Sequence, residues 1–237
     1  MKIDTEEIKK DFCQSFCVMY SGEDYECGKG GLCPFKGKIT HQKEIEEERN
    51  KKIFHLVTKD LKFIDPEEEE FRANNILGIV VRYSHSAKAW MCMSLNQLNS
   101  DCQWSIDLEV DVQTTLDNSI ENIKILKSIS PDLSKFPAAK AVEEYAVATG
   151  KNFYLGSSDD MFTVQMKANI IKDMIERYRL KSNIDFGNYF WTSSTGYDKY
   201  ICGLDLDGKY VNCCYDRDLS YSVLPIGILI LSLIHIS

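Results

Sequence analysis

The sequence predicts an α+β domain in which two small antiparallel sheets pack with two helices, and three observations support this. Residues 76–98 contain two apolar, β-branched stretches that a turn separates. Residues 137–179 carry apolar side chains at helical spacing. Residues 186–230 return to strand-like segments, and their Asp207-Gly208 dipeptide is typical of a hairpin turn. Strands followed by helices and then by further strands indicate an α+β fold.

Composition narrows the class of protein. The chain has 237 residues, of which 44% are apolar and 27% charged, which is enough for one sizeable core and a small extra unit. The formal net charge is -8 and no basic stripe is present, so we expect no nucleic-acid partner. The N-terminal residues resemble no secretory signal, and no apolar run is long enough to span a bilayer. We therefore expect a cytoplasmic protein, or a phage-particle protein if a virion carries it.

The last seven residues, 231–237, are expected to lie outside the natural protein. Their sequence, LSLIHIS, matches the translation of a sequencing-library adaptor, which would make the source an assembled metagenome. The alternative is a genuine strand that continues the apolar residues 224–230. We exclude residues 231–237 from the prediction of the fold.

A small helical unit is predicted for residues 1–72, with helices over 4–20 and 41–58. The boundary is placed at Asp65-Pro66, which four glutamates follow. This unit contains four cysteines within 21 residues: Cys13, Cys17, Cys27 and Cys33. Four thiolates suit a structural zinc ion, although the C-x3-C-x9-C-x5-C spacing also allows free thiols or disulfides. His41 is a spare candidate ligand.

The main domain is predicted over residues 73–230. Its first elements are a hairpin of strands 76–83 and 89–98, and then a short helix over 119–126. The next helix starts at Pro137, because proline is accepted in a first helical turn, and ends at Gly150.

A single long helix is predicted from Ser158 to Arg179. Ser157 or Ser158 is expected to cap it, because a serine hydroxyl can accept a free N–H of the first turn. Asp159 and Asp160 suit its positive N-terminus.

The C-terminal part is predicted to contain a strand over 186–195, a hairpin and a final strand over 222–230. Counting outward from the Asp207-Gly208 turn places Cys202 opposite Cys213 in a hydrogen-bonded pair. That arrangement is workable, though not ideal, for a disulfide. Because no signal peptide is seen, the nine cysteines in general are expected to be reduced thiols or metal ligands.

A ligand-binding surface is expected around this hairpin, since tyrosine and arginine offer large contact area with a polar end. The alternative is that half of these residues are ordinary strand residues. The candidate contact residues are Tyr197, Tyr200, Tyr210, Asn212, Cys214, Tyr215, Asp216, Arg217, Asp218 and Tyr221.

Three motifs, FPAAKAVEEY, FYLGSSDD and FWTSST, occur in this order. With the strands around them, they resemble bacterial and phage domains of C-type-lectin fold that are related to formylglycine-generating enzyme. Within that group, residues 74–230 are similar to the variable proteins of diversity-generating retroelements and to adhesin-like surface domains. The chain departs from the usual pattern at Phe153, Gly156 and Leu224, where the group has Trp, Pro and Arg. The resemblance implies a C-type-lectin-like fold and a non-enzymatic domain that binds a protein or carbohydrate ligand.

Other functions are weighed against this one. The oxidase relatives bind copper through paired cysteines, but Cys213 and Cys214 are adjacent and point to opposite faces of a strand. A calcium lectin would use Asp205, Asp207 and Asn212, although calcium needs six or more oxygens. A structural or regulatory protein that works through its cysteine unit is the third alternative.

The residues of segment 197–222 also suggest how the surface arose. Tyr, Asp, Ser, Cys, Arg and Gly can all be reached from an AAC codon by changing its two adenines, and most residues from Tyr210 to Ser222 belong to that set. Adjacent cysteines on an exposed edge are otherwise hard to justify by stability. We therefore expect diversification by adenine-directed mutagenesis. Such diversification requires a template repeat near the gene that differs from the segment only at template adenines. If the flanking DNA is complete and contains no such repeat, the diversification hypothesis is excluded.

The N-terminal cysteine unit is predicted to bind one zinc ion through Cys13, Cys17, Cys27 and Cys33. Such a site would supply folding free energy that the small unit otherwise lacks. Elemental analysis of protein purified without chelator measures the metal. We expect about one zinc per chain, and less than about 0.2 would contradict the prediction.

Overall fold

The computed structural model of the chain describes residues 49–84, 89–196, 200–208 and 212–229. The chain divides into two compact units, residues 1–51 and 52–237. The first lies almost entirely outside the described residues, and so do the expected helix 4–20 and the four cysteines of the predicted zinc site. The fold described below is that of the second unit.

The second unit contains two sheets and four α-helices in its described part. One 3-10 turn, Ala73–Asn75, precedes the third strand. The strands and helices in chain order are β1 (Leu56–Thr58), β2 (Phe63–Ile64), β3 (Ile76–Ser84), β4 (Ala89–Ser94), β5 (Leu98–Gln103), α3 (Ser119–Ile129), α4 (Pro137–Thr149), β6 (Phe153–Leu155), α5 (Ser158–Met166), α6 (Ala168–Arg177), β7 (Tyr189–Thr195), β8 (Ile201–Asp205), β9 (Asn212–Tyr215), β10 (Ser220–Val223) and β11 (Pro225–Leu229).

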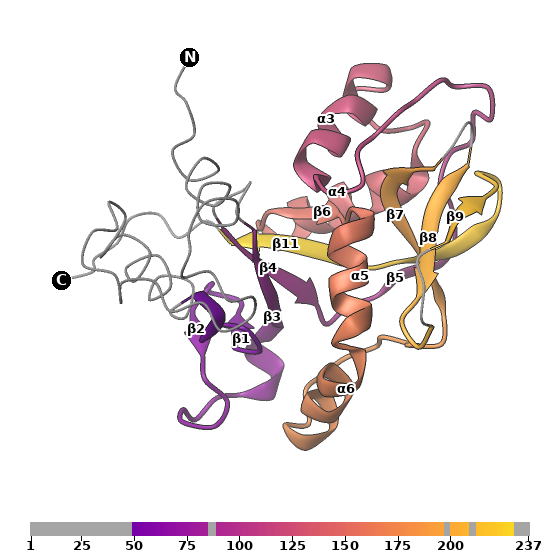
Figure 1. Cartoon of the computed structure of the whole chain (residues 1–237). Coiled ribbons are helices and arrows are strands. Elements are labelled where there is room, and N and C mark those ends of the chain that lie inside the picture. The colour runs from indigo at the N-terminus through magenta and orange to yellow at the C-terminus, as the bar shows by residue number, and fades with distance from the viewer. Residues whose placement is uncertain (1–48, 85–88, 197–199, 209–211, 230–237) are drawn as a thin grey trace, which may run out of the picture. The chain divides into compact units, whose positions relative to one another are not determined.

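The first sheet has six strands in the order β2-β1-β3-β4-β11-β6, and the second has five in the order β5-β10-β7-β8-β9. The mixed α+β class predicted from the sequence is therefore confirmed. The final strand was expected to be continuous, but it divides at Leu224 into β10 and β11. These two strands belong to different sheets, and the fully buried Leu224 joins them. The second half, β11, runs beside β4 in the first sheet (Figure 1).

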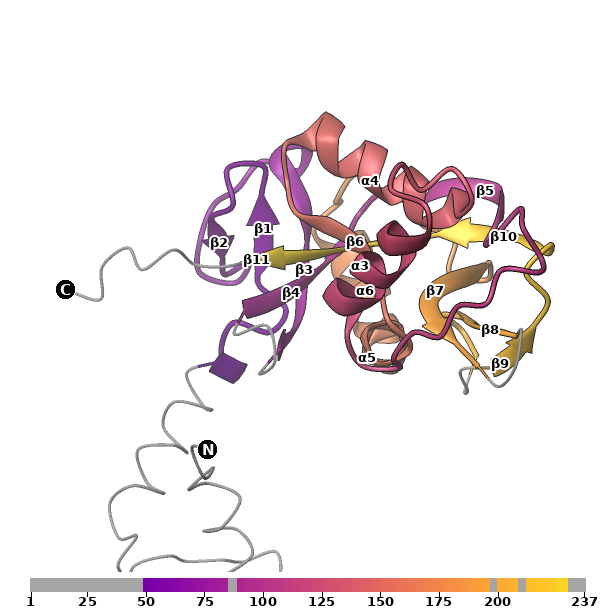
Figure 2. The same cartoon turned by 90° about the horizontal axis from the view of Figure 1, so that it is seen from above.

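Helix α5 lies between the two sheets, and α6 follows at its lower end in Figure 1. Figure 2 shows the same elements from above. Their buried residues, among them Val164 and Ile171, form one core cluster with side chains of both sheets, such as Met93 and Leu204. A second cluster combines α3 and α4 with the other side of the second sheet, including Trp191. The predicted inward face of this helical region is therefore confirmed at Val164 and Ile171.

The helix ends follow the local signals in the sequence. Pro137 occupies the first turn of α4, and Gly150 ends it with φ 64°, in the left-handed region where glycine meets no Cβ penalty. Ser157 caps α5: its hydroxyl accepts the N–H of Asp160, whose carboxylate accepts the N–H of Ser157 in return.

The Asp160 carboxylate is also a junction between elements. It is 2% exposed, and it pairs with the Arg82 guanidinium of β3 and accepts the Ser119 hydroxyl at the start of α3. The N–H of Ser157 reaches the Ser119 hydroxyl at 2.9 Å as well. The first sheet, α3 and the start of α5 are thus joined through one buried anion.

Strand β7 is joined to the rest by hydroxyl groups. Residues 192–195 are polar but buried. The Asn122 amide of α3 donates to the Thr115 carbonyl at 2.8 Å and to the Ser193 hydroxyl at 2.9 Å, while its oxygen accepts the Thr115 N–H at 2.7 Å. Burying polar groups costs little when each has such a partner. The FWTSST motif therefore anchors β7 to α3 and to the loop before it.

The helix predicted over residues 41–58 ends earlier than expected, because its described residues are helical only at 49 and 50. A helical turn covers Arg49 and Asn50, but Phe54 has φ 70°, which ends a right-handed helix. The following residues, Leu56–Thr58, form β1 and pair with β3, where their β-branched and apolar side chains are fully buried or nearly so. The expected boundary at Asp65-Pro66 consequently falls inside the second unit, which begins at Lys52.

The single helix predicted over 158–179 is in fact two helices. Lys167 separates α5 from α6 with φ -107° and ψ 2°, and its N–H bonds to the Val164 carbonyl three residues back. Burial lowers the pKa of this lysine, and the charge of Arg82 lowers it further. The apolar spacing continues across the break, which explains why the sequence pattern did not reveal it.

We predict that Ile171→Ala lowers the free energy of unfolding by roughly 2–4 kcal/mol, because it leaves a cavity in the core. Ile171 is fully buried, whereas its neighbour Ile170 is 48% exposed. Ile170→Ala is therefore the matched control, with an expected change within about 0.5 kcal/mol. Denaturant unfolding of both variants measures the difference, and equal effects would show that the packing of α6 is incorrect.

Candidate functional site

The C-terminal part of the second sheet exposes most of the residues that the sequence analysis singled out. Asn212, Cys214, Asp216 and Asp218 are exposed, and Tyr200 is half-buried. Tyr197 and Tyr210 lie outside the described residues. The polar candidates around β9 are thus accessible to a ligand.

Strands β8 and β9 pair in the predicted register near the turn, with Gly203 opposite Asn212. A bulge then shifts the pairing, so that Ile201 lies opposite Tyr215. Strand β8 ends at Asp205, and residues 209–211, which follow the predicted Asp207-Gly208 turn, lie outside the described residues. Between the two described pairs, Cys202 and Cys213 form a disulfide.

For Cys202 and Cys213, this disulfide corrects the general expectation that the cysteines are reduced thiols or metal ligands. The two cysteines lie on neighbouring strands at facing positions, where their sulfurs can meet. It also removes part of the case for diversification, because Cys213 now has a structural role and only Cys214 remains as an exposed thiol at this edge. Cys92 and Cys102 are buried, and burial raises the pKa of the Cys92 thiol.

Three tyrosines form an aromatic surface on one face of this sheet, and we call Tyr189, Tyr215 and Tyr221 the tyrosine patch. Tyr189 and Tyr221 stack, with ring centroids 5.3 Å apart and an interplanar angle of 29°. Tyr215 meets Tyr221 edge-on at 5.1 Å and Tyr189 at 5.9 Å. Below them lies the buried Trp191, whose ring centroid is 4.5 Å from that of Tyr221.

The strand geometry explains why these rings meet. Tyr189 and Trp191 are two residues apart in β7, so both point to the same face. Strand β10 pairs with β7 in parallel, with Ser222 opposite Phe190, which brings Tyr221 beside Tyr189.

Tyr215 belongs to β9, which the intervening β8 separates from β7. Gly203 of β8 makes the contact feasible: a Cβ there would lie 3.0 Å from the Tyr215 ring. The Tyr215 ring therefore lies across the glycine to reach the other two tyrosines.

The rings rest on a rigid foundation. The Trp191 indole N–H donates to the Cys102 carbonyl at 2.6 Å, which links β7 to β5 below the patch. Tyr189, at 43% exposure, is the outermost ring, and Tyr215 and Tyr221 are half-buried. Aromatic rings held by strands and by one another lose little conformational entropy on binding, which suits them to recognition.

Arg217 is buried, so it is not a ligand contact as the sequence analysis expected. It is 4% exposed, its guanidinium donates to the Val110 carbonyl, and it lies 5.8 Å over the Trp104 ring. The Trp104 indole N–H in turn donates to the Thr192 carbonyl of β7 at 2.8 Å. Arg217 therefore holds the loop between β9 and β10 against the core.

Sequence reasoning missed Tyr189, the most exposed ring of the patch. It was assigned to an aromatic strand and not to the binding surface. The alternation of Tyr189 and Trp191 was the available signal, because it places both rings on one face. The partner strand that completes the patch, however, depends on the parallel pairing of β7 with β10.

The acidic residues near the hairpin have other partners. Asp207 forms an ion pair with Lys172 of α6. The Asp205 carboxylate lies against Gly208. Among the described residues, no group of three or more His, Cys, Asp or Glu side chains converges as metal ligands would. The described part of this surface therefore offers aromatic and polar contact area.

A scan of the sequence against protein-family models finds no match, and a search of curated proteins finds none either. The structure is similar to the crystal structure of a fimbrial protein from Bacteroides ovatus, with a TM-score of 0.52 and 11% sequence identity. The similarity covers 74% of this chain and 48% of that one, so the chain spans about half the length of the fimbrial protein. At this identity the match concerns the fold alone. No helix in the described ranges is long and apolar enough to cross a membrane.

Burial raises the pKa of Tyr215 and of Tyr221 above the usual tyrosine value of 10.0. For Tyr215 the Asn212 side chain partly offsets this by a hydrogen bond that lowers the pKa. The neutral phenol is thus favoured in the folded state. The resulting stability is complete below the pKa of the unfolded state, about 10, and is lost as the pH rises through the higher folded pKa.

We predict that the Tyr221 phenol ionises with a pKa above that of an ordinary tyrosine, and that Tyr221→Phe removes this titration. Absorbance titration at alkaline pH measures this as the difference between the wild-type and Tyr221→Phe curves. The free energy of unfolding of the wild type should also fall above about pH 10 more steeply than that of the variant. If the missing phenol titrates at the ordinary value, the burial of the patch is contradicted.

Proposed function

We propose that the chain is a non-enzymatic binding module of adhesion type, and that the tyrosine patch is the centre of its contact surface. The observation that carries this is the aromatic cluster of the exposed Tyr189 with the half-buried Tyr215 and Tyr221 on one face of the second sheet. Tyrosine is over-represented at the centre of protein interfaces, where it buries a large area and keeps a polar end. The surrounding Asn212, Asp216 and Asp218 supply polar contacts at the rim.

The comparison of folds supports an adhesion-type role only in a general way, since the similar solved structure is called a fimbrial protein. The resemblance of the sequence motifs to C-type-lectin-fold domains points in the same direction. We propose that residues 73–230 are such a domain, with the preceding β1 and β2 added to its first sheet. The ligand would be a protein or a carbohydrate, because protein side chains and sugar rings can both pack against tyrosine.

The Cys202–Cys213 disulfide indicates the redox environment in which the module acts. A disulfide such as Cys202–Cys213 persists in oxidising surroundings and is rare in a reducing cytoplasm. Exposure on a particle or a cell surface therefore suits this chain better than the cytoplasmic location that the sequence favoured. The competing proposal, a regulatory protein that acts through zinc at Cys13, Cys17, Cys27 and Cys33, predicts instead that removing the metal abolishes function.

We predict that Tyr189→Ala and Tyr221→Ala each weaken ligand binding by about 10- to 50-fold, which corresponds to roughly 1.4–2.3 kcal/mol of lost contact energy. The probes are an array of glycans and an array of extracellular proteins, followed by measurement of the dissociation constant for each selected ligand.

Phe162→Ala is the matched control, because Phe162 is 41% exposed on α5, close to the 43% of Tyr189. Its affinity should equal that of the wild type, and thermal melting checks that each variant is folded. The proposal fails if neither array yields a ligand, or if the tyrosine variants bind as well as the wild type does.

A further inference from the structure

The disulfide between β8 and β9 lies next to a third cysteine, Cys214, which is exposed. Cys202 belongs to β8, and Cys213 and Cys214 are neighbours in β9. A cysteine thiolate breaks a disulfide by attacking one of its sulfurs, and the rate of attack depends on access. Three cysteines on two paired strands therefore permit a change of disulfide partner.

The bulge in β9 places both Cys213 and Cys214 opposite Cys202 of β8. The two pairs that flank the bulge are Asn212 with Gly203 and Tyr215 with Ile201. Between these pairs β9 has two residues and β8 has one, which is the arrangement of a β-bulge. Either cysteine of β9 can therefore become the partner of Cys202 if the extra residue changes place.

The bulge also interrupts the alternation of faces along β9. Residues directly opposite each other in a ladder point to the same face, so Asn212 and Tyr215 both lie on the face of the tyrosine patch. A hydrogen bond between the Asn212 side chain and the Tyr215 phenol agrees with this. Cys213 and Cys214 consequently share the other face, and the opposite faces predicted for these neighbours in a regular strand are corrected.

We propose that the Cys214 thiolate attacks the Sγ atom of Cys202 and exchanges the disulfide between β8 and β9. The Cys202–Cys213 bond breaks and the Cys202–Cys214 bond forms. Cys213 leaves as a thiolate and takes up the proton that Cys214 lost. The number of electrons is unchanged, so the exchange consumes neither oxidant nor reductant. It can therefore proceed in the oxidising surroundings that the disulfide indicates.

The new bond would shift the register of β9 on the turn side of the bulge. Tyr215 keeps its partner in β8, and Cys214 then pairs with Cys202 in regular succession. The registers on the two sides of the bulge differ by one residue, so the exchange lengthens one at the expense of the other. The bulge moves toward the Asp207-Gly208 turn, where hairpins accept loops of two or three residues.

This shift would change the surface beside the tyrosine patch, and here the inference rests on the function proposed above. Cys213 comes to lie opposite Gly203, in the place of Asn212. A shift of one residue turns a side chain to the other face, so Asn212 leaves the patch. The Tyr215 phenol then loses its hydrogen bond to Asn212, and a bound ligand loses a polar contact. The choice of disulfide partner would thus regulate the affinity of the patch.

Mapping the thiol of β9 in the full chain tests the exchange without any ligand. Dilute protein is incubated at about pH 8.5, where an ordinary thiol is half ionised, then acidified mildly and labelled with a maleimide. Peptide fragmentation shows whether the label is on Cys213 or on Cys214. We expect the label on Cys213 in at least about 1% of the chains, as for a minor state at equilibrium. A smaller fraction overturns the proposal.

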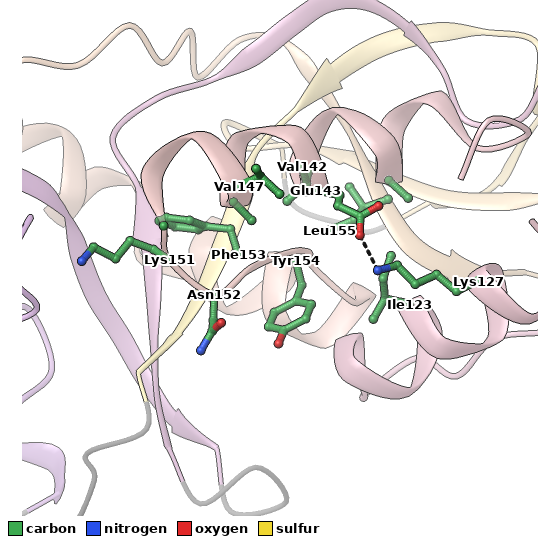
Figure 3. Close-up of a pocket in the computed structure, with 13 residues that line it drawn as sticks. Ile123, Lys127, Val142, Glu143, Val147, Lys151, Asn152, Phe153, Tyr154 and Leu155 are labelled. Atoms are coloured by element: carbon green, nitrogen blue, oxygen red, sulfur yellow. Dashed lines mark hydrogen bonds and ion pairs between the residues drawn. The ribbon is translucent and has the colours of Figure 1, made fainter. Parts of the chain in front are cut away.

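Two controls test whether Cys214 is the attacking group. Cys214→Ala removes its thiol, so the Cys202–Cys213 bond should remain intact under the same conditions. In that background, Val147→Cys restores an exposed thiol at a 77% exposed residue of the hollow between α3, α4 and β6 (Figure 3). Helix α4 and β9 lie apart in Figures 1 and 2, so this thiol should also leave the bond intact. Exchange in either control contradicts the assignment to Cys214.

Cys213→Ala and Cys214→Ala separate the two registers. Refolded with oxidised glutathione, Cys213→Ala should contain the Cys202–Cys214 bond, and its absence is evidence against the exchange. Absorbance titration against Tyr215→Phe in each background should give a higher Tyr215 pKa in Cys213→Ala, because the hydrogen bond to Asn212 is lost. Asn212→Ala in the Cys214→Ala background should raise this pKa equally. Equal Tyr215 pKa values in the two cysteine variants would refute the register shift.

A ligand selected for the tyrosine patch tests the regulation separately. It should bind Cys213→Ala at least about threefold more weakly than Cys214→Ala, as expected for one lost hydrogen bond. Equal affinities would refute the regulation of the patch even if the bond map shows exchange. If no ligand is found, the proposed function fails, while the bond map and the Tyr215 titration still decide whether the exchange and the register shift occur.

Discussion

The arrangement of the two sheets depends on the buried carboxylate of Asp160. A charge at 2% exposure would cost several kcal/mol without partners, and here Arg82, Ser119 and the Ser157 N–H supply them. These partners come from β3, from α3 and from the turn before α5. The carboxylate therefore fixes where α5 begins, and the next N–H, that of Ser158, bonds to the Ser194 hydroxyl of β7 at 2.9 Å. Through this chain of contacts the first sheet determines the position of the second.

Local signals made much of this fold predictable. The hairpin of β3 and β4, the proline and glycine at the two ends of α4, and the Ser157 cap each depend on a few neighbouring residues, and each was identified from the sequence. The errors arose where distant partners decide the outcome. Residues 56–58 continue an apolar helical pattern, but they become β1 because β3 offers a ladder to pair with. Likewise, one apolar segment divides at Leu224 because its two halves join different sheets.

In the candidate site, too, local signals were predictable and the effects of distant partners were not. The sequence identified Tyr215 and Tyr221 from their residue type, but composition cannot say which side chains of a segment face outward. Arg217 has the composition of an interface residue, yet it is buried beside Trp104, a partner 113 positions earlier in the chain. Tyr189 lies in a strand whose other residues are buried, and its exposure follows from its place at the edge of the patch. The place of β6 at the end of the first sheet could not be predicted, because the order of strands in a sheet depends on how distant segments pair and not on the residues of one strand.

The Cys202–Cys213 disulfide has a mechanical consequence. A protein that holds a ligand while its chain is anchored elsewhere carries tension, and strands that are pulled apart lengthen the chain. The disulfide joins residues 11 apart in the sequence, so about 35 Å of fully extended chain is excluded from lengthening while the bond remains intact. Strands β8 and β9 would then stay together under load, and Tyr215 would remain beside the glycine over which it lies. A reductant would make the same surface extensible.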